Sequence, residues 1–501
     1  MAAERAWATK DRLIIFTTAL VLRIAAGALF FGSVDVINAA EASLGLFAGR
    51  PVHVPYFPTI NAFLWFGGVL SAKLPLPFPL SLKLAPILFD SLTAVLIRDL
   101  VARTARDLAF RAGLLYAISP VALLIISFQG QWDSIALFFL LLAFGVREGG
   151  SSLRRREFCF GALFAVSLLA KPIALPFLAL FPRRKGDVLT PEWPAVAGLF
   201  AALSSAFAIS EAYGYSVGES LIRISAYSMK GVQMFGLPFS PWLAGFAALS
   251  HRMFWIAPIM LVLAVFYHRG TLSAVDSMTL FYLFSLATAG LSPQYLLWPL
   301  PLLLVTRRLR PAAIYTGVAT GFLLLFYMNP WASYFAFENL AIFAPIRQLA
   351  WLLPPAVLAK RELLPVVQAL GNIVFPACTL SIALFVLNKG RLQPAERPGR
   401  AQDDWPVRRA VWYSAPALLL AAIILLAKLT IDTRLVLPRL LEIWKAIPSQ
   451  YAVHVESLKP ATLLVGDFGK FGPLNIIVLL AVLAMLWCTL AAVDMNRRPN
   501  S

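Results

Sequence analysis

The sequence predicts an all-α polytopic membrane protein with about 14 transmembrane helices, each of roughly 20 residues, and interfacial helices in its external loops. Hydrophobic residues make up 60% of the 501-residue chain and charged residues 14%, against about 45–50% and about 25% in soluble domains. Lys and Arg total 43, and Asp and Glu total 25. The basic residues cluster in short runs between apolar stretches, which is typical of cytoplasmic loops rather than of a nucleic-acid-binding surface.

The first apolar stretches predict simple crossings, with basic runs marking the cytoplasmic side. These spans lie at 12–31, 79–98, 108–127 and 132–147. The external stretch 32–78 contains a shorter apolar piece, 59–72, which predicts an interfacial helix. Arg23 and Lys83 lie inside predicted spans, and we expect structural partners for such costly groups.

Two longer apolar stretches have basic residues at both ends and a break in the middle. Lys171-Pro172 interrupts 158–182, and Ser292-Pro293 interrupts 276–306. Proline removes a backbone donor and disfavours helix at the residue before it. Each stretch therefore predicts a pair of short helices that enters the membrane and returns, with its break at the external tip.

The remaining spans are predicted at 194–212, 242–267, 311–328, 364–388, 410–430 and 471–493. Between them, 213–240 and 329–363 are expected to be external, and both termini cytoplasmic. We divide the chain into a transmembrane core at 1–388, a cytoplasmic linker at 389–409, and C-terminal transmembrane helices at 410–501 that enclose an external segment, 431–470.

No cofactor site is indicated by the sequence. The three cysteines lie in apolar stretches without a CxxC spacing, and the four histidines show no ligand spacing. No glycine-rich GxxxxGK phosphate loop is present. A divalent metal ion would be compatible with the chain, but nothing in the sequence indicates one.

Four polar features fall on the external side of this topology. They are the acidic first loop, the turn 128–133, the Lys171-Pro172 break and the break at 290–295. An external carboxylate can take a proton from an acceptor hydroxyl, and a cation at the membrane surface can hold a phosphate. This combination suits transfer of a sugar from a polyprenyl-phosphate donor.

The same stretches resemble the GT-C superfamily of integral-membrane glycosyltransferases, and most of all the bacterial relatives of its mannosyltransferases and glucosyltransferases. The resemblance covers about residues 10–390. It rests on three groups of stretches: Ser33-Val34-Asp35-Val36 with Tyr56-Phe57-Pro58; Ser119-Pro120 with Phe128-Gln129-Gly130-Gln131-Trp132-Asp133-Ser134; and Leu169-Ala170-Lys171-Pro172 with Ser292-Pro293-Gln294-Tyr295-Leu296-Leu297-Trp298-Pro299.

The resemblance implies that Asp35 is the catalytic base of an inverting displacement. Val34 and Val36 flank it, so the paired acidic motif of many members is absent, which favours a metal-free mechanism. A helix cap or an interfacial charge is the alternative for Asp35. Lys171, helped by Arg223 or Lys230, is expected to hold the donor phosphate.

Alternatives remain for these cations and for the other polar residues. Lys171 could instead form a salt bridge with Asp133 or Asp35, and Asp133 could cap the helix that begins there. The residues expected to bind substrate, besides the three cations, are Glu41, Tyr56, Gln129, Gln131, Asp133, Gln294 and Tyr295.

The function expected from these observations is transfer of a hexose, with mannose favoured, to a lipid or glycan acceptor. The donor is a polyprenyl-phosphate sugar, and the reaction takes place on the periplasmic face of a bacterial cytoplasmic membrane. Expected partners are the donor, the acceptor and membrane lipids, and no nucleic acid. The alternatives are a lipid or solute transporter or flippase, and an oligosaccharide ligase that uses a diphosphate donor.

Overall fold

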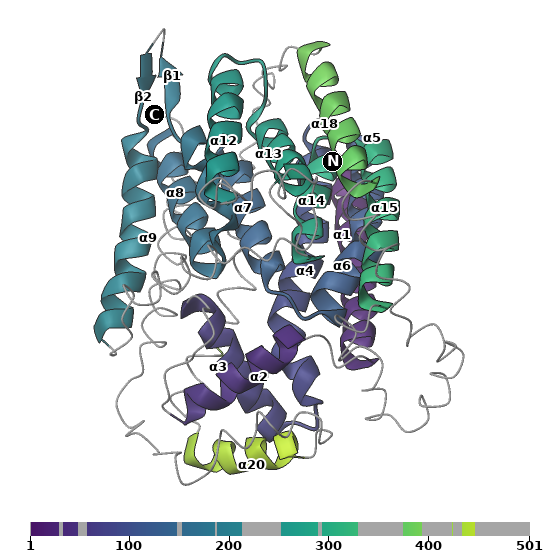
Figure 1. The fold of residues 1–501 in the computed structure, drawn as a ribbon, viewed down its shortest axis with the longest axis vertical. Helices are drawn as coiled ribbons and strands as arrows, with labels where there is room; N and C mark the ends of the chain where they lie inside the picture. The colour runs from purple at the N-terminus through teal and green to yellow at the C-terminus, as the bar shows by residue number, and fades with distance from the viewer. Residues whose placement is uncertain are drawn as a thin grey trace, which may run out of the picture.

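A computed structural model describes most of the core and one C-terminal helix. Its described residues are 2–29, 34–48, 58–147, 153–185, 188–212, 252–288, 293–328, 374–392, 423 and 433–445. Apart from one two-stranded hairpin, every regular element among them is a helix. Figure 1 shows most helices aligned with the long axis of the molecule, and α2, α3 and α20 gathered at one end. The all-α prediction is confirmed for this part of the chain, although the hairpin was not predicted.

The N-terminal part of the bundle is organised around α4. Its elements are α1 (Ala2–Leu29), α2 (Val34–Phe47), α3 (Pro58–Lys73), α4 (Phe78–Ala102), α5 (Arg106–Ala117), α6 (Pro120–Ala122), the π-helix η1 (Leu123–Phe128) and α7 (Asp133–Arg147). Helix α4 contacts α1, α3, α5 and α7, and 22 of its 25 residues are buried. A helix that is buried on all sides lies in the centre of a bundle.

The next elements form a helical pair with a hairpin attached. They are α8 (Leu153–Ala170), the 3₁₀ helix η2 (Pro172–Leu180), strands β1 (Arg183–Lys185) and β2 (Val188–Thr190), and α9 (Trp193–Ala212). The strands pair antiparallel. Helices α8 and α9 approach closely at two glycines, because a Cβ at Gly161 would lie 1.9 Å from Ala195 O and one at Gly198 would lie 2.1 Å from Phe158 O. Small residues permit such contacts between membrane helices.

The C-terminal elements complete the described part. They are α12 (Arg252–His268), α13 (Ala274–Thr288), the 3₁₀ helix η3 (Pro293–Leu297), α14 (Pro299–Val305), α15 (Leu309–Met328), α18 (Phe375–Leu392) and α20 (Thr433–Lys445). Helix α18 extends into the predicted linker 389–409. Helix α20 belongs to the predicted external segment 431–470 and packs on α2 and α3. The loops 213–240 and 329–363 and the spans 410–430 and 471–493 lie outside the described residues, except for residue 423.

Both interrupted stretches return to the end of the bundle from which they start. Arg147, at the end of α7, donates to Leu180 O and Phe181 O, both at 2.7 Å, and its Nε lies 3.3 Å from Glu157 Oε2. Because Glu157 lies near the start of α8 and Leu180 ends η2, the two ends of this hairpin lie together. We name α8–η2 the first hairpin.

The second hairpin, α13 with η3 and α14, closes in the same way. Asp276 lies in the first turn of α13, and its Oδ1 is 2.5 Å from Nη1 of Arg308, which follows α14. The prediction that both stretches fold back is therefore confirmed.

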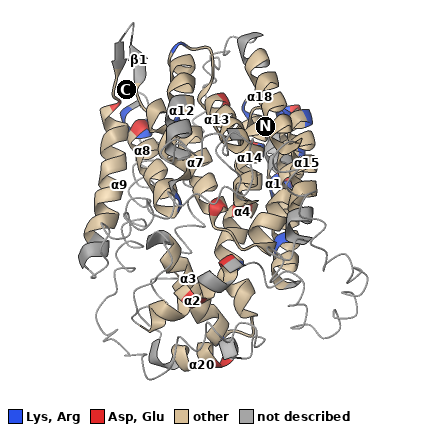
Figure 2. Ribbon diagram, in the orientation of Figure 1, with Lys and Arg blue, Asp and Glu red and all other residues tan. Residues whose placement is uncertain are grey.

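Charged residues gather at the end of the bundle opposite α20 (Figure 2). There Arg12, in the N-terminal half of α1, pairs with Asp99 at the end of α4, with Nη2 and Oδ2 3.0 Å apart. Arg103, just after α4, donates to Gly145 O at 2.9 Å near the end of α7. We call this end the basic end, because it carries the arginine-rich connections of the described chain.

Two of the described helices are long and apolar enough to cross a membrane, Phe78–Ala102 and Arg106–Phe128. Five shorter apolar helices accompany them: Trp193–Ala208, Ile259–His268, Ala274–Ala287, Pro293–Val305 and Phe375–Asn388. The second long helix is not the uninterrupted span that the sequence predicted, because it is broken at Ser119-Pro120. The full set of 14 spans remains a prediction.

Candidate functional site

The candidate site is built on a tight turn between η1 and α7. Gln129 N donates to Leu124 O at 2.8 Å and Gln131 N to Ile125 O at 3.1 Å, so the turn is anchored on the π-helix. Gly130 has a φ of +78°, a conformation that glycine adopts without a steric penalty. A Cβ at this position would also lie 2.5 Å from Val36 Cγ2. The turn can therefore press against α2 only with glycine at its centre.

This turn contacts the carboxylate of Asp35, which is half-buried in the first turn of α2. Gln129 Nε2 donates to Asp35 Oδ2 at 3.1 Å, and Gln131 Nε2 donates to the same oxygen at 2.6 Å. Two N–H donors on one oxygen complement the charge of a carboxylate and fix its orientation. The structure thus joins the first predicted external feature to the second.

Lys171 joins the third feature to the same group. It lies between α8 and η2, at the turning point of the first hairpin, and its Nζ is 2.6 Å from Asp133 Oδ2 and 3.5 Å from Gln131 Oε1. The Lys171 side chain is 25% exposed, whereas that of Asp133 is 0% exposed. Of the two alternatives left open by the sequence, a salt bridge to Asp133 is therefore present in the structure.

Trp298 brings in the fourth feature. This residue follows η3 in the second hairpin, and its Nε1 donates to Asp133 Oδ1 at 2.6 Å. Asp133 is the first residue of α7, where a negative charge is favoured by the helix dipole. Its two oxygens therefore connect the turning points of both hairpins. The Tyr295 ring lies 4.3 Å from the Trp298 ring, centroid to centroid.

The two hairpins also pack directly on each other. Tyr282 of α13 donates its hydroxyl to Ile173 O of η2 at 3.0 Å. The rings of Phe177 and Tyr282 lie 5.2 Å apart and those of Tyr282 and Trp298 5.1 Å apart, centroid to centroid. Aromatic pairs at these separations add about 0.5–1.5 kcal/mol each beyond the area they bury. The position of Lys171 is therefore fixed by side chains of both hairpins.

The structure places the predicted site residues in three groups. It brings together Asp35, Gln129, Gln131, Asp133 and Lys171 through the hydrogen bonds above, with Tyr295 next to Trp298 at the edge of this network. Gln294 is half-buried on η3, and Glu41 is half-buried further along α2. Tyr56, Arg223 and Lys230 lie outside the described residues.

Two features of the site were missed by the sequence reading. Trp298 was noted only as part of a stretch, although a buried indole N–H normally needs an acceptor and Asp133 was available. Gly130 was included in the predicted turn at 128–133, but its close approach to Val36 of α2 was not predicted. Both signals were present in the sequence, but neither names a partner.

Comparison with known proteins identifies no relative. No family model matches the chain, and no curated protein or solved structure matches it significantly. The resemblance to GT-C glycosyltransferases thus rests on the quoted residues alone. Within the described residues no group of three or more His, Cys, Asp or Glu side chains could hold a metal ion.

Proposed function

We propose that this protein is an integral-membrane glycosyltransferase that moves a hexose, with mannose favoured, from a polyprenyl-phosphate donor to a lipid or glycan acceptor. One observation carries the proposal: the network from Asp35 through Gln131 and Lys171 to Asp133 and Trp298. In this network Gln131 contacts both the half-buried carboxylate of Asp35 and the partly exposed ammonium group of Lys171. These are the two groups that sugar transfer from a phosphate needs.

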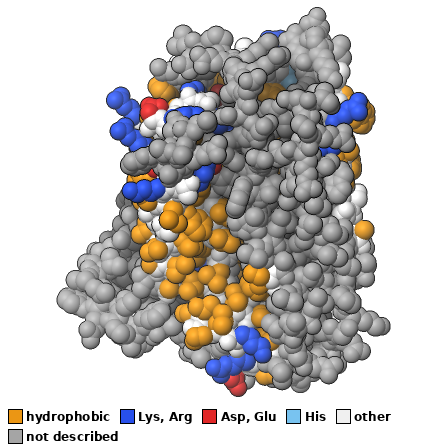
Figure 3. All heavy atoms as spheres, turned by 180° about the vertical axis from the view of Figure 1, so that it is seen from behind, with side chains coloured by type: hydrophobic (Ala, Val, Ile, Leu, Met, Phe, Trp, Pro, Cys, Tyr) orange, Lys and Arg blue, Asp and Glu red, His pale blue; other side chains and the backbone are white. Residues whose placement is uncertain are grey.

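A membrane location is supported by the surface as well as by the two long helices. Figure 3 shows a broad apolar patch on one face, with charged side chains above and below it. Large apolar side chains are exposed on α1, α9, α12 and α15, among them Val21 (63%), Phe200 (60%), Leu261 (66%) and Ile314 (58%). Large exposed apolar side chains on several helices support contact with lipid.

The charge distribution supports an orientation. The arginine-rich connections lie at the basic end, and cytoplasmic loops are the ones enriched in Lys and Arg. We therefore propose that the network of Asp35 and Lys171, which lies away from the basic end, faces the periplasm. As the sequence predicts, both termini are proposed to be cytoplasmic.

In the proposed reaction, Asp35 accepts the proton of an acceptor hydroxyl. The oxygen attacks the anomeric carbon and forms the new glycosidic bond. The bond from that carbon to the phosphate oxygen breaks, its electron pair stays on that oxygen, and polyprenyl phosphate leaves. Attack opposite the leaving group inverts the anomeric configuration. The donors from Gln129 and Gln131 hold Asp35 in one orientation for this step.

Lys171 is proposed to stabilise the charge that develops on the leaving phosphate. Its ammonium group has three donors, of which one faces Asp133 and another lies 3.5 Å from Gln131. Its 25% exposure leaves part of the side chain accessible to a ligand. Asp133 is fully buried and is proposed to act through Lys171, while Tyr295, next to Trp298, offers an aromatic face to the sugar.

A transporter is the second candidate, because two helical hairpins with broken turning points meet at one charged pair. Discontinuous helices of this kind form the midplane sites of many transporters. The two candidates differ in outcome: a transferase changes the covalent structure of its donor, whereas a transporter moves it intact.

One experiment separates them. Purified protein in lipid vesicles is given radiolabelled polyprenyl-phosphate mannose or polyprenyl-phosphate glucose together with a bacterial lipid and glycan extract. The proposal predicts label in a new product, with free polyprenyl phosphate released in equal amount. Label that crosses the vesicle membrane but stays on its original lipid would support the transporter, and no new product from either donor would overturn the transferase.

A further inference from the structure

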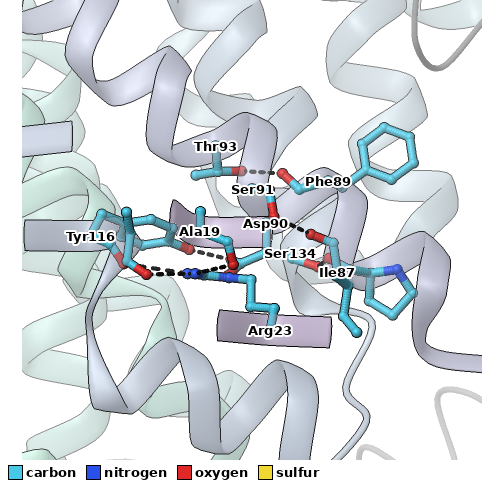
Figure 4. Close-up of polar contacts among 11 residues, drawn as sticks. Ala19, Arg23, Ile87, Phe89, Asp90, Ser91, Thr93, Tyr116 and Ser134 are labelled. Carbon is cyan, nitrogen blue, oxygen red and sulfur yellow. Dashed lines mark hydrogen bonds and ion pairs between the residues drawn. The ribbon is translucent and has the colours of Figure 1, made fainter. Parts of the chain in front are cut away.

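A second polar cluster, remote from the proposed chemistry, lies inside the bundle. Arg23 of α1, Asp90 of α4 and Tyr116 of α5 are each 0% exposed. Arg23 Nε lies 2.5 Å from Asp90 Oδ2, and the Tyr116 hydroxyl donates to Asp90 Oδ1 at 2.5 Å (Figure 4). A buried ion pair is weak evidence for stability, since apolar residues of similar volume often replace it without loss. The Arg23–Asp90 pair therefore needs an explanation other than stability.

The backbone contacts of Arg23 suggest a role for this buried pair. Its Nη1 donates to Ala117 O at 2.6 Å and its Nη2 to Tyr116 O at 3.3 Å. These are the last two residues of α5, and Pro120 follows. Proline has no N–H, so it cannot give Tyr116 O the usual helical hydrogen bond, and Ser119 N donates to this oxygen instead at 3.1 Å. The guanidinium of Arg23 therefore caps the carbonyls at the point where α5 breaks.

The break leads directly to the site. After Pro120 the chain runs through α6 and η1 to Gln129 and Gln131, which donate to Asp35. Beyond the turn, Ser134 Oγ donates to Pro86 O of α4 at 2.9 Å. Asp90 lies one helical turn from Pro86 on the same helix. Figure 4 shows Arg23, Asp90, Tyr116 and Ser134 around this part of α4. The segment that carries the turn is thus attached to α4 at both of its ends.

We propose that Arg23, Asp90 and Tyr116 are positioning residues for the turn 129–131. They fix the break in α5, and the break sets where Gln129 and Gln131 meet Asp35. The geometric part of this inference stands on the contacts alone. Its consequence for sugar transfer rests on the proposed function.

The test measures the position of the turn without measuring activity. In protein whose three native cysteines are replaced, Asp35→Cys and Gln131→Cys introduce a pair of thiols that a short bifunctional methanethiosulfonate can bridge. The rate of cross-linking is compared with and without the double replacement Arg23→Met, Asp90→Leu. That replacement removes both charges together, so no unpaired charge stays buried and the fold is expected to persist.

The inference predicts that cross-linking slows by at least about fivefold in the double-replacement protein, as a shift in conformer populations would cause. The matched control is Arg12→Met, Asp99→Leu, which removes an ion pair between α1 and α4 near the basic end. Its cross-linking rate should equal that of the parent. An unchanged rate in the Arg23→Met, Asp90→Leu protein would overturn the inference.

A second variant keeps the test decisive if the double replacement does not fold. Arg23→Lys can still pair with Asp90, but a lysine lacks the planar fork that reaches two carbonyls at the same time. We expect slower cross-linking here also, and an unchanged rate would again overturn the inference.

Sugar transfer is then read in protein that keeps Asp35 and Gln131. Arg23→Lys is expected to lower kcat and to leave the KM for the donor near the wild-type value, because the turn orients the base and does not bind the donor. If wild-type protein transfers no sugar while cross-linking still responds, the proposed function falls and the positioning role stands. If transfer occurs and cross-linking does not respond, the positioning role falls.

Discussion

The Arg23–Asp90 pair and the Lys171–Asp133 pair have the same arrangement of hydrogen-bond partners but differ in the exposure of the cation. In both, a carboxylate with 0% exposure accepts from a cation at Oδ2 and from an aromatic side chain at Oδ1, Tyr116 in the first case and Trp298 in the second. Arg23 is 0% exposed, whereas Lys171 is 25% exposed. We call the first pair sealed because both of its side chains are fully buried. A sealed pair can interact only with other parts of the protein. The second is open on the side of its cation, so it can also act on a ligand.

The choice of cation agrees with this difference. Arginine has a planar fork with five donors, which here serves a carboxylate and three backbone carbonyls, those of Ala19, Ala117 and Tyr116. Lysine is a compact charge on a flexible stem, suited to following a phosphate as its bonds change. Burial of the cation, more than the presence of an ion pair, therefore distinguishes a structural pair from a candidate functional pair.

The largest effect is expected when the sealed pair is broken on one side. Arg23→Met leaves Asp90 buried without its cation, which should cost about 3–5 kcal/mol of unfolding free energy. Thermal unfolding in detergent measures it, with Arg23→Met, Asp90→Leu as the matched rescue. Recovery of stability in the double variant supports the comparison. A single variant as stable as wild type would show that the pair is not sealed.

A smaller effect, and on a different quantity, is expected at the open pair. Lys171→Met should lower kcat for sugar transfer about 100-fold, or about 2.7 kcal/mol in the barrier, by removing a charge opposite the leaving phosphate. The exposed Lys73 at the end of α3 offers a control, because Lys73→Met removes the same charge elsewhere. Equal rates for Lys171→Met and wild type would remove the functional side of the comparison.

Next comes the turn that connects the two pairs. Gly130→Ala adds a Cβ 2.5 Å from Val36 Cγ2 on a backbone with φ of +78°, and the strain should cost about 1–3 kcal/mol. Adding Val36→Ala relieves the contact but not the backbone strain, so only part of the loss should return. Chemical unfolding of the single and double variants measures both parts. Complete recovery would mean that the backbone of the turn is unstrained.

The smallest effect is expected at a pair that is open on both sides. Arg439 and Glu442 of α20 lie 2.9 Å apart, with side chains 62% and 68% exposed. Arg439→Ala should change the unfolding free energy by less than about 0.5 kcal/mol, as is usual for surface ion pairs. A larger loss of unfolding free energy in the same measurement would mean that α20 needs this pair to pack on α2 and α3.

Apart from α2, the sequence predicted the main helices of the described core and both returning hairpins, because each carries a local signal. A run of apolar residues marks a helix, and Pro172 and Pro293 mark the breaks. It also predicted a structural partner for Arg23, and Asp90 is that partner. The identity of the partner could not be predicted, since Arg23 and Asp90 are 67 positions apart in the chain and meet only through the packing of α1 on α4.

The candidate site was predicted in its members more than in its connections. Lys171 was expected to hold a phosphate or to pair with Asp133 or Asp35, and only the packed hairpins show that Asp133 is its partner. Helix α2 was overlooked, because its alanine-rich stretch lies in a loop too polar to read as a span. Trp298 was not assigned a role for the same reason as Asp90: its acceptor lies 165 positions away.

The most direct test of the whole account is the initial rate of sugar transfer by Asp35→Asn. Loss of a general base should slow transfer by about 100-fold to 10,000-fold, while the midpoint of thermal unfolding stays close to wild type. Asp107→Asn, at an exposed carboxylate in the first turn of α5, is the matched control and should transfer at the wild-type rate. A stable Asp35→Asn protein that transfers sugar as fast as wild type would contradict the account.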